Sequence, residues 1–247
     1  MCHHLPKRYG SSMKIFTLYI GTSPRSPASP VVTPLRIREL LSPRFPSFTI
    51  LPTVGVFRGN AEDTFVIKLT TQDVTDLLRE VEVIRRELDQ DGIGVEHCGR
   101  FVRVAEGAEL CSMRRDLYPR VRAEYFDTQF RTQKPDSGWP TQFAVITARN
   151  PDGCCTGDKH NKSLDAELDS FCAAKDLVRW SITGGSRDFS HAEPGFGVEC
   201  DLPTALAIGR RFRQEAIFWI QNGLLSLQMC DGAHDVPLGY WEAKVLG

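Results

Sequence analysis

The stretch GVFRGNAEDTFVI, residues 55–67, has a later counterpart in GGSRDFSHAEPGFGV, residues 184–198. Each is a glycine-rich turn that holds an arginine, followed by a glutamate and then by an apolar run. Glycine permits the positive φ angles that tight turns need, and short apolar runs beside such turns are typical of buried strands. The sequence therefore predicts one strand-and-turn element that occurs twice.

Two further matches flank these stretches in the same order. Upstream, FTLYIGTSP (16–24) aligns with FAVITARNP (143–151), and downstream, LDQDGIGV (88–95) aligns with FRQEAIFW (212–219). The downstream match places one glutamine of each segment opposite the other. Three matches in one order indicate a duplicated unit, which sets the architecture but not the chemistry.

Hydrophobic periodicity predicts the same series of elements in both halves. In helix 74–88 the apolar residues repeat near every 3.6 positions, and Asp73 is a suitable N-cap. The first half is expected to contain strand 14–20, helix 35–41, strands 48–54 and 64–69, helix 74–88 and a strand near 93–104 that breaks at Gly99. The second half is expected to contain strand 142–148, helix 163–174, strands 177–183 and 196–200, helix 203–213, and strands 216–220 and 224–229.

Each half therefore has the order β-α-β-β-α-β, which folds as a small, mostly antiparallel sheet with helices on one face. The predicted fold class is α+β, as a tandem pair of such units. The expected organisation is a leader or disordered extension (1–12), a first unit (13–104), a linker (105–140), a second unit (141–230) and an irregular C-terminal tail (231–247). Tyr240 and Trp241 are expected to fold back from this tail onto the body.

The composition is that of an ordinary globular protein. The chain has 247 residues, is 41% hydrophobic and 25% charged, and has a net charge of −1. No broad basic field favours non-specific nucleic-acid binding, and no apolar run reaches the length that spans a bilayer. The eight cysteines show no zinc-finger spacing, so reduced thiols and a cytoplasmic location are expected.

The second unit carries motifs that point to a known family. They are Thr147, Ala148, Asn150 and Pro151 at a strand end, then Glu193 before an apolar strand, then Phe212, Gln214, Ala216, Ile217 and Phe218. In these residues, over roughly 141–230, the chain resembles an uncharacterised bacterial family, numbered thirty-two ninety-three among the domains of unknown function. Gly195 stands where the family pattern has serine. The resemblance implies a bacterial or phage origin and no particular activity, and the first unit looks like a diverged copy.

The candidate site residues are those that the two units share at predicted strand ends. Asn150, Arg187, Glu193 and Gln214 are expected to line one pocket, with Glu62 and Gln90 as ligand-binding counterparts in the first unit. A carboxylate accepts hydrogen bonds and an amide both donates and accepts, so together they hold a polar ligand. The alternative is structural, with the glutamate and glutamine satisfying backbone groups of the turn and the helix end.

Three functions remain open. The favoured one is a non-catalytic binding or adaptor protein, which uses a polar pocket, a groove between the units or an oligomeric interface to hold a small polar ligand or a protein partner. The second is an enzyme for a small polar or nucleotide-like substrate, with Glu193 as general acid or base. The third is RNA binding through arginine clusters and the strand aromatics Phe143, Trp180 and Trp219. No cofactor, metal or membrane is expected, and His191 near Glu193 is a surface histidine.

Overall fold

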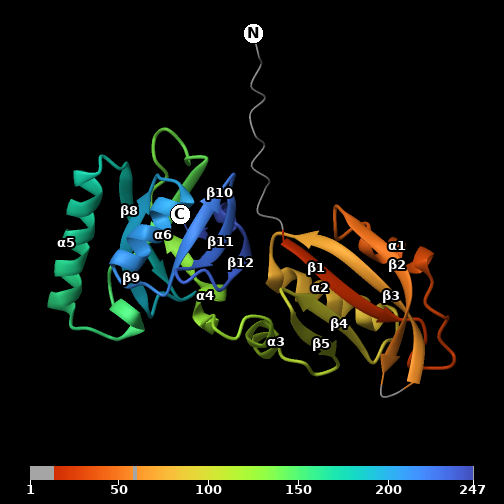
Figure 1. The fold of residues 1–247 in the computed structure, drawn as a ribbon. Coiled ribbons are helices and arrows are strands. Elements are labelled where there is room, and N and C mark those ends of the chain that lie inside the picture. The colour runs from red at the N-terminus through yellow and green to blue at the C-terminus, as the bar shows by residue number, and fades with distance from the viewer. Residues whose placement is uncertain (1–13, 58–59, 247) are drawn as a thin grey trace, which may run out of the picture.

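The computed structural model describes residues 14–57 and 60–246, and it folds as two α+β units side by side (Figure 1). The expected extension at residues 1–12 lies outside the described residues. Unit 1 contains β1 (Lys14–Gly21), α1 (Pro34–Leu41), β2 (Phe48–Phe57), β3 (Asn60–Thr71), α2 (Val74–Glu87), β4 (Gly92–His97) and β5 (Arg100–Ala105). Its strands lie in the order β2-β3-β1-β4-β5, and every pair is antiparallel.

Unit 2 repeats this topology. It contains β7 (Gln142–Ile146), η1 (Pro151–Gly153), α5 (Asp158–Ala174), β8 (Arg179–Gly185), β9 (Ala192–Val198), α6 (Leu202–Arg211), β10 (Ala216–Gln221) and β11 (Leu224–Met229). These strands lie in the order β8-β9-β7-β10-β11, which is the order of unit 1 strand for strand. The predicted α+β class and the mostly antiparallel sheets are therefore confirmed, and both units have the split β-α-β arrangement of ferredoxin-like folds.

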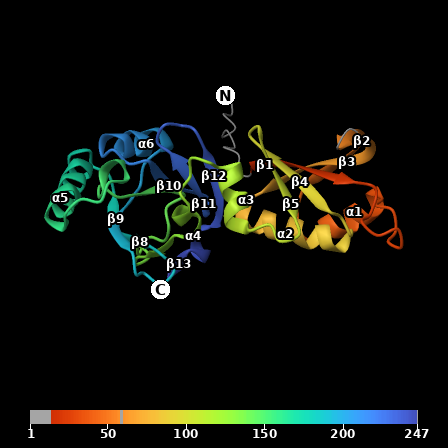
Figure 2. The same ribbon diagram turned by 90° about the horizontal axis from the view of Figure 1, so that it is seen from below.

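Helices α2 and α6 begin where the sequence supplies a capping side chain. The Asp73 side chain accepts hydrogen bonds from the backbone of Thr75 and Asp76 at the start of α2. Asp201 accepts one from Thr204 at the start of α6. Such caps satisfy backbone N–H groups that have no partner within the helix. Figure 2 shows α1 and α2 along the lower side of unit 1, α6 along the upper edge of unit 2 and α5 at the outer end of unit 2.

Strand register relates the two units residue by residue. In unit 1, Tyr19 on β1 lies opposite Gly94, which is four residues after Gln90. In unit 2, Val145 on β7 lies opposite Phe218, which is four residues after Gln214. Tyr19 therefore corresponds to Val145, whereas the sequence match aligned it with Ile146. The sequence match is therefore wrong by one residue along this strand. A one-residue shift exchanges the two faces of a strand.

The segment expected to be a linker is largely structured. It forms α3 (Leu110–Leu117), α4 (Ala123–Asp127) and β6 (Gln129–Arg131), and β6 pairs with β8 at the edge of the unit 2 sheet. α3 packs against α2 and β5 of unit 1, whereas α4 and the chain around β6 cover the face of the unit 2 sheet that lies opposite α5 and α6. Phe130 and Phe143 are fully buried there, and Trp180 is partly buried against them, as core residues rather than as an exposed platform.

The prediction of an irregular tail was wrong. Residues after 230 form β12 (Asp235–Tyr240), η2 (Trp241–Ala243) and β13 (Val245–Leu246), with β12 paired to β11 and β13 to β6. The reason is apolar burial, since Val236, Leu238 and Trp241 are each at most 3% exposed. Tyr240, which was expected to pack on the body with Trp241, is 59% exposed.

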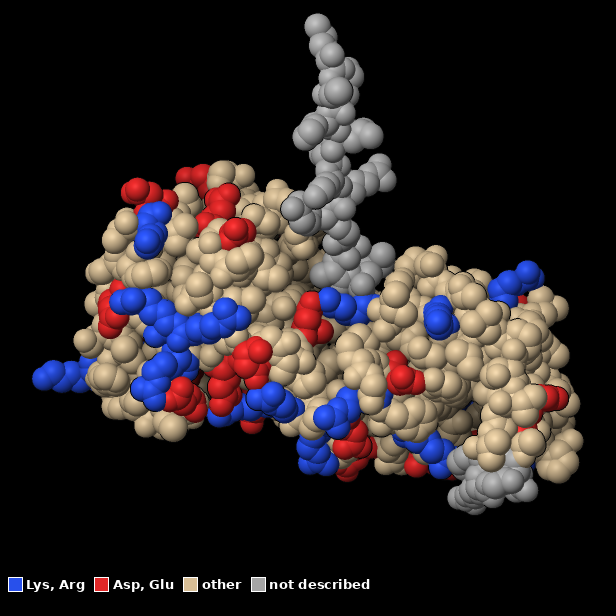
Figure 3. All heavy atoms as spheres, in the orientation of Figure 1, with Lys and Arg blue, Asp and Glu red and all other residues tan. Residues whose placement is uncertain are grey.

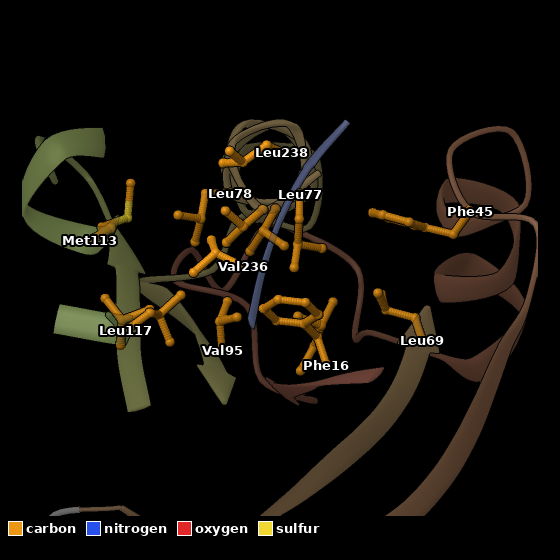
Figure 4. Packing of buried hydrophobic residues seen from close by; sticks show 14 of the residues in the cluster. Phe16, Phe45, Leu69, Leu77, Leu78, Val95, Met113, Leu117, Val236 and Leu238 are labelled. Carbon is orange, nitrogen blue, oxygen red and sulfur yellow. The ribbon is translucent and has the colours of Figure 1, made fainter. Parts of the chain in front are cut away.

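β12 joins the two units. The Gly239 backbone N–H donates to the Gln72 carbonyl at 2.9 Å, and Lys14 forms an ion pair with Asp235. Figure 4 shows Val236 and Leu238 among core residues of unit 1, next to Leu77 and Leu78 of α2 and close to Phe16 and Val95. The end of the unit 1 core is therefore completed by a strand of the unit 2 sheet.

We expect Leu238→Ala to lower the free energy of unfolding by about 2–5 kcal/mol, because it leaves a cavity in a core that both units share. Leu35→Ala on α1 is the control, since that side chain is 55% exposed and the change should cost less than about 0.5 kcal/mol. Urea unfolding followed by circular dichroism measures both variants. Equal effects would show that β12 does not support the core.

Burial lowers the pKa of His97, although its hydrogen bond to the Ile15 carbonyl opposes this effect. The unfolded chain then binds more protons than the folded chain below about pH 6.5, so stability should fall as the pH drops through that value. His97→Gln should reduce the loss of unfolding free energy between about pH 7.5 and about pH 5.5. Urea titrations at the two pH values test this, and an unchanged pH dependence would contradict it.

Candidate functional site

A pocket of about 530 Å³ lies in unit 2, between the sheet and the segment formed by α4 and β6. Its apolar wall comes from Phe130, Val145, Ile182 and Phe218. Polar residues from β9, the β8–β9 turn and the end of α6 line another part of it: Arg187, His191, Glu193 and Gln214. Three of the predicted residues, Arg187, Glu193 and Gln214, thus lie around one pocket, and the fourth contacts it through Glu193.

Glu193 lies on β9 opposite Gly184 of β8, and its side chain is 28% exposed. One carboxylate oxygen, Oε1, accepts a hydrogen bond from Asn150 Nδ2 at 2.5 Å. The same oxygen lies 3.6 Å from His191 Nε2. Glu193 is therefore held in place from the side of η1 while it still faces the pocket.

Asn150 does not line the pocket, but it orients the Glu193 carboxylate, which does. Its backbone is left-handed, with φ 51°, a conformation that asparagine tolerates better than most residues. Its Oδ1 accepts from the Thr156 backbone N–H at 3.0 Å and from Asn161 Nδ2 at 3.2 Å. Since Asn161 is buried, Asn150 is fixed on every side and presents one N–H to Glu193.

Gln214 follows α6 through Arg213, which has a left-handed backbone with φ 54°. The side-chain nitrogen, Nε2, donates to the carbonyls of Arg149 at 3.0 Å and Phe212 at 3.2 Å. These two bonds satisfy backbone carbonyls, as expected if Gln214 had a structural role. They also fix the amide orientation, which leaves the Oε1 acceptor for a ligand in the pocket.

Unit 1 repeats the glutamine arrangement. Asp89 is left-handed with φ 50°, and the next residue, Gln90, donates through Nε2 to the Ser23 carbonyl at 2.9 Å. A Cβ placed on Gly21 would lie 2.6 Å from Glu62 Oε1 and 3.3 Å from Gln90 Oε1, so the two oxygens converge above this glycine. Both residues line a second pocket, of about 600 Å³. The predicted site residues thus divide between two equivalent pockets.

Arg187 lies at the exposed tip of the β8–β9 turn, and neighbouring side chains order this turn. The Asp188 carboxylate accepts hydrogen bonds from Ser186 Oγ at 2.7 Å and from the Ser190 backbone N–H at 3.1 Å. These bonds, led by that from Ser186, lower the pKa of Asp188 to about 2. Ser186 therefore has a turn-forming role, and the turn keeps Arg187 at the rim of the pocket.

The sequence analysis missed Tyr125, which α4 places against Phe218 with ring centroids 5.9 Å apart. Burial, and secondarily the charge of Glu215, raises the pKa of Tyr125 to about 12, so its hydroxyl stays protonated as a donor. No described group forms a hydrogen bond with that hydroxyl. Only the tertiary fold brings Tyr125 to the pocket, because α4 belongs to the segment that the sequence treated as a linker.

Within residues 14–57 and 60–246, no three His, Cys, Asp or Glu side chains converge as metal ligands would. A search for spanning segments found no described helix that is both long and apolar enough to cross a membrane.

The RNA alternative depended on strand aromatics and arginine clusters. Phe143 and Trp219 are buried, so they offer no stacking surface. Arg85 and Arg114 are also buried and bind Glu82 and Asp127, respectively. Figure 3 shows Lys and Arg interspersed with Asp and Glu on the face that it presents, without a single basic field.

Residues 146–217 match the model of a family described as protein of unknown function (DUF3293). This match confirms the resemblance of the C-terminal region, and it spans Asn150, Glu193 and Gln214. A Cβ on Gly195 would lie 2.5 Å from the Ile146 carbonyl oxygen. A search of curated proteins found no match.

Among solved structures, a phage SAM lyase in its apo state is similar to part of this chain. The two are 14% identical, the match covers 43% of this chain and 99% of the other, and the TM-score is 0.32.

We expect Asn150→Ala to lower the free energy of unfolding by about 1 kcal/mol more than Asn150→Gly does. Both variants lose the side-chain bonds to Glu193 and Asn161, but only alanine carries a Cβ at the left-handed position. Urea unfolding of both variants measures the difference. If the glycine variant is equally or less stable, backbone strain is not what requires asparagine here.

Proposed function

We propose that the unit 2 pocket binds a small molecule with an apolar body and an amino or ammonium group, and that the protein is a non-catalytic binding protein. The observation that carries this proposal is the orientation of Gln214. Its nitrogen is committed to the carbonyls of Arg149 and Phe212, so the amide presents an oxygen beside the Glu193 carboxylate. Two acceptors at one end of an apolar pocket favour an N–H donor.

The surroundings support the same class of ligand. Phe130, Val145, Ile182 and Phe218 provide an apolar surface for the body of the molecule. Asn150 holds one oxygen of Glu193, which reduces the conformational freedom that the carboxylate would otherwise lose on binding. A charge-assisted hydrogen bond to such a carboxylate contributes about 1.5–3 kcal/mol.

The two units are, in this proposal, diverged copies of one ancestral unit. Their strand orders are identical, and each has a left-handed residue followed by a glutamine after its second helix. Each glutamine amide bonds the carbonyl beyond the first strand, at Ser23 in unit 1 and Arg149 in unit 2. Such a detailed correspondence favours duplication over independent origin.

The enzyme alternative uses the same carboxylate, with Glu193 as general acid or base. His191, with Nε2 3.6 Å from Glu193 Oε1, is the observation that favours it, because it adds a second titratable group. Native mass spectrometry of the purified protein distinguishes the two functions. A co-purified molecule that stays chemically unchanged over time supports binding, and its conversion into a product supports catalysis.

Titration calorimetry with 2-phenylethylamine and 3-phenylpropionate tests the proposed pocket. The amine should bind at least about tenfold more tightly, because Glu193 and Gln214 present acceptor oxygens at the polar end of the pocket, whereas Arg187 lies at its rim and Tyr125 offers a single hydroxyl donor. Glu193→Gln should weaken binding of the amine by about tenfold, whereas the matched variant Glu62→Gln in unit 1 should leave it unchanged. Equal binding of the two probes, or an unaffected Glu193→Gln variant, would overturn the proposal.

A further inference from the structure

Among residues 14–57 and 60–246, no helix or strand covers the sheet face of unit 1 that lies opposite α1 and α2. On it lies the pocket of about 600 Å³, whose lining includes Tyr19, Glu62, Gln90, Phe101 and Arg103. The corresponding face of unit 2 is covered by the segment around α4 and β6 and by the buried Trp241. The two pockets therefore share their polar end but differ in what lies beside it.

Two glycines turn this face into a flat platform. A Cβ on Gly94 would lie 2.6 Å from Phe101 Cε2, and a Cβ on Gly92 would lie 2.9 Å from Arg103 Cζ. The absence of these two atoms lets the Phe101 ring and the Arg103 guanidinium lie across β4. Phe101 is 58% exposed, so its ring is available for stacking. Aromatic rings and guanidinium planes are the groups on which planar ligands stack.

Unit 2 has no such platform. Ala216 and Phe218 stand where unit 1 has Gly92 and Gly94, and Leu225 stands where unit 1 has Phe101. Leu225 is 1% exposed, and Phe218 packs against Phe130 with ring centroids 5.0 Å apart. The open, flat surface is thus a property of unit 1 alone.

The polar end of the unit 1 pocket offers acceptors. Gln90 is 4% exposed, and its nitrogen is committed to the Ser23 carbonyl, so Oε1 is the atom near Gly21. Glu62 Oε1 converges on the same glycine, and no described residue donates a hydrogen bond to the Glu62 carboxylate. Two acceptor oxygens above one glycine match a group that carries two N–H bonds.

We propose that this pocket binds a planar heteroaromatic ring with an exocyclic amino group, of the kind found in adenine and cytosine. The ring stacks on Phe101, and the amino group donates to Glu62 Oε1 and Gln90 Oε1. The site uses the same kind of acceptor pair as the unit 2 pocket but is a separate site. This proposal can therefore be tested independently of the proposed function of the unit 2 pocket. A net charge of −1 favours a free nucleoside over a base within a single strand.

Saturation-transfer NMR and titration calorimetry on the full chain test this with matched nucleosides. Adenosine is compared with inosine and cytidine with uridine, because each pair differs by replacement of the amino group with an oxo group. At least one of the two amino nucleosides should bind at least about tenfold more tightly than its oxo partner. No binding at millimolar concentration, or equal binding within both pairs, would overturn the proposal.

Variants locate the site. Phe101→Ala removes the stacking surface at an exposed position, and Gly21→Ala places a methyl group between the two acceptors, so each should weaken binding about tenfold or more. Glu193→Gln in the other pocket should have no effect, which separates this proposal from the proposed function. Thermal melts confirm that each variant is folded. Loss of binding in Glu193→Gln but not in Phe101→Ala would refute the assignment.

An oligonucleotide arm separates the two sources of such a ring. If the site takes a free nucleoside, a deoxyadenosine oligomer should bind no more tightly per site than adenosine, with little dependence on salt. Much tighter, strongly salt-dependent binding of the oligomer would overturn the assignment to a free nucleoside.

Discussion

Both units depend on a glutamine amide that is bonded to the backbone before any ligand is present. In each, the second helix ends in a left-handed residue, Asp89 or Arg213, which turns the chain so that the next side chain reaches the end of the first strand. The amide nitrogen of Gln90 or Gln214 then donates to a carbonyl there. One interaction thereby joins helix end to strand end and directs an acceptor oxygen into the pocket.

The surroundings of this shared arrangement have diverged. In unit 2 the sheet face beside the acceptors is covered by α4, β6 and Trp241, and the result is an apolar pocket. In unit 1 no described element covers the same face, which has Gly92 and Gly94 where unit 2 has larger residues. A common polar end with different apolar walls is an economical way for one fold to bind two kinds of molecule.

Most of the fold could be predicted from the sequence, because helix periodicity, Asp73 as a cap and the glycine turns are local signals. The pairing of Glu62 with Gln90 and of Glu193 with Gln214 could be predicted because the two halves of the sequence carry these residues in the same order. The roles of α4, β6 and β12 could not, since short segments rich in charge or proline carry no strong periodicity. Their structure is set by burial of Phe130, Val236 and Trp241 against distant parts of the chain.

The position of β12 has a consequence for the order in which the protein folds. Unit 1 is synthesised before unit 2, but Val236 and Leu238, which complete its core, come after the unit 2 strands in the sequence. During translation the apolar end of α2 around Leu77 and Leu78 therefore stays uncovered until unit 2 has nearly emerged. Unit 1 can therefore complete its folding only after unit 2 has been synthesised, so the two units fold together rather than one after the other.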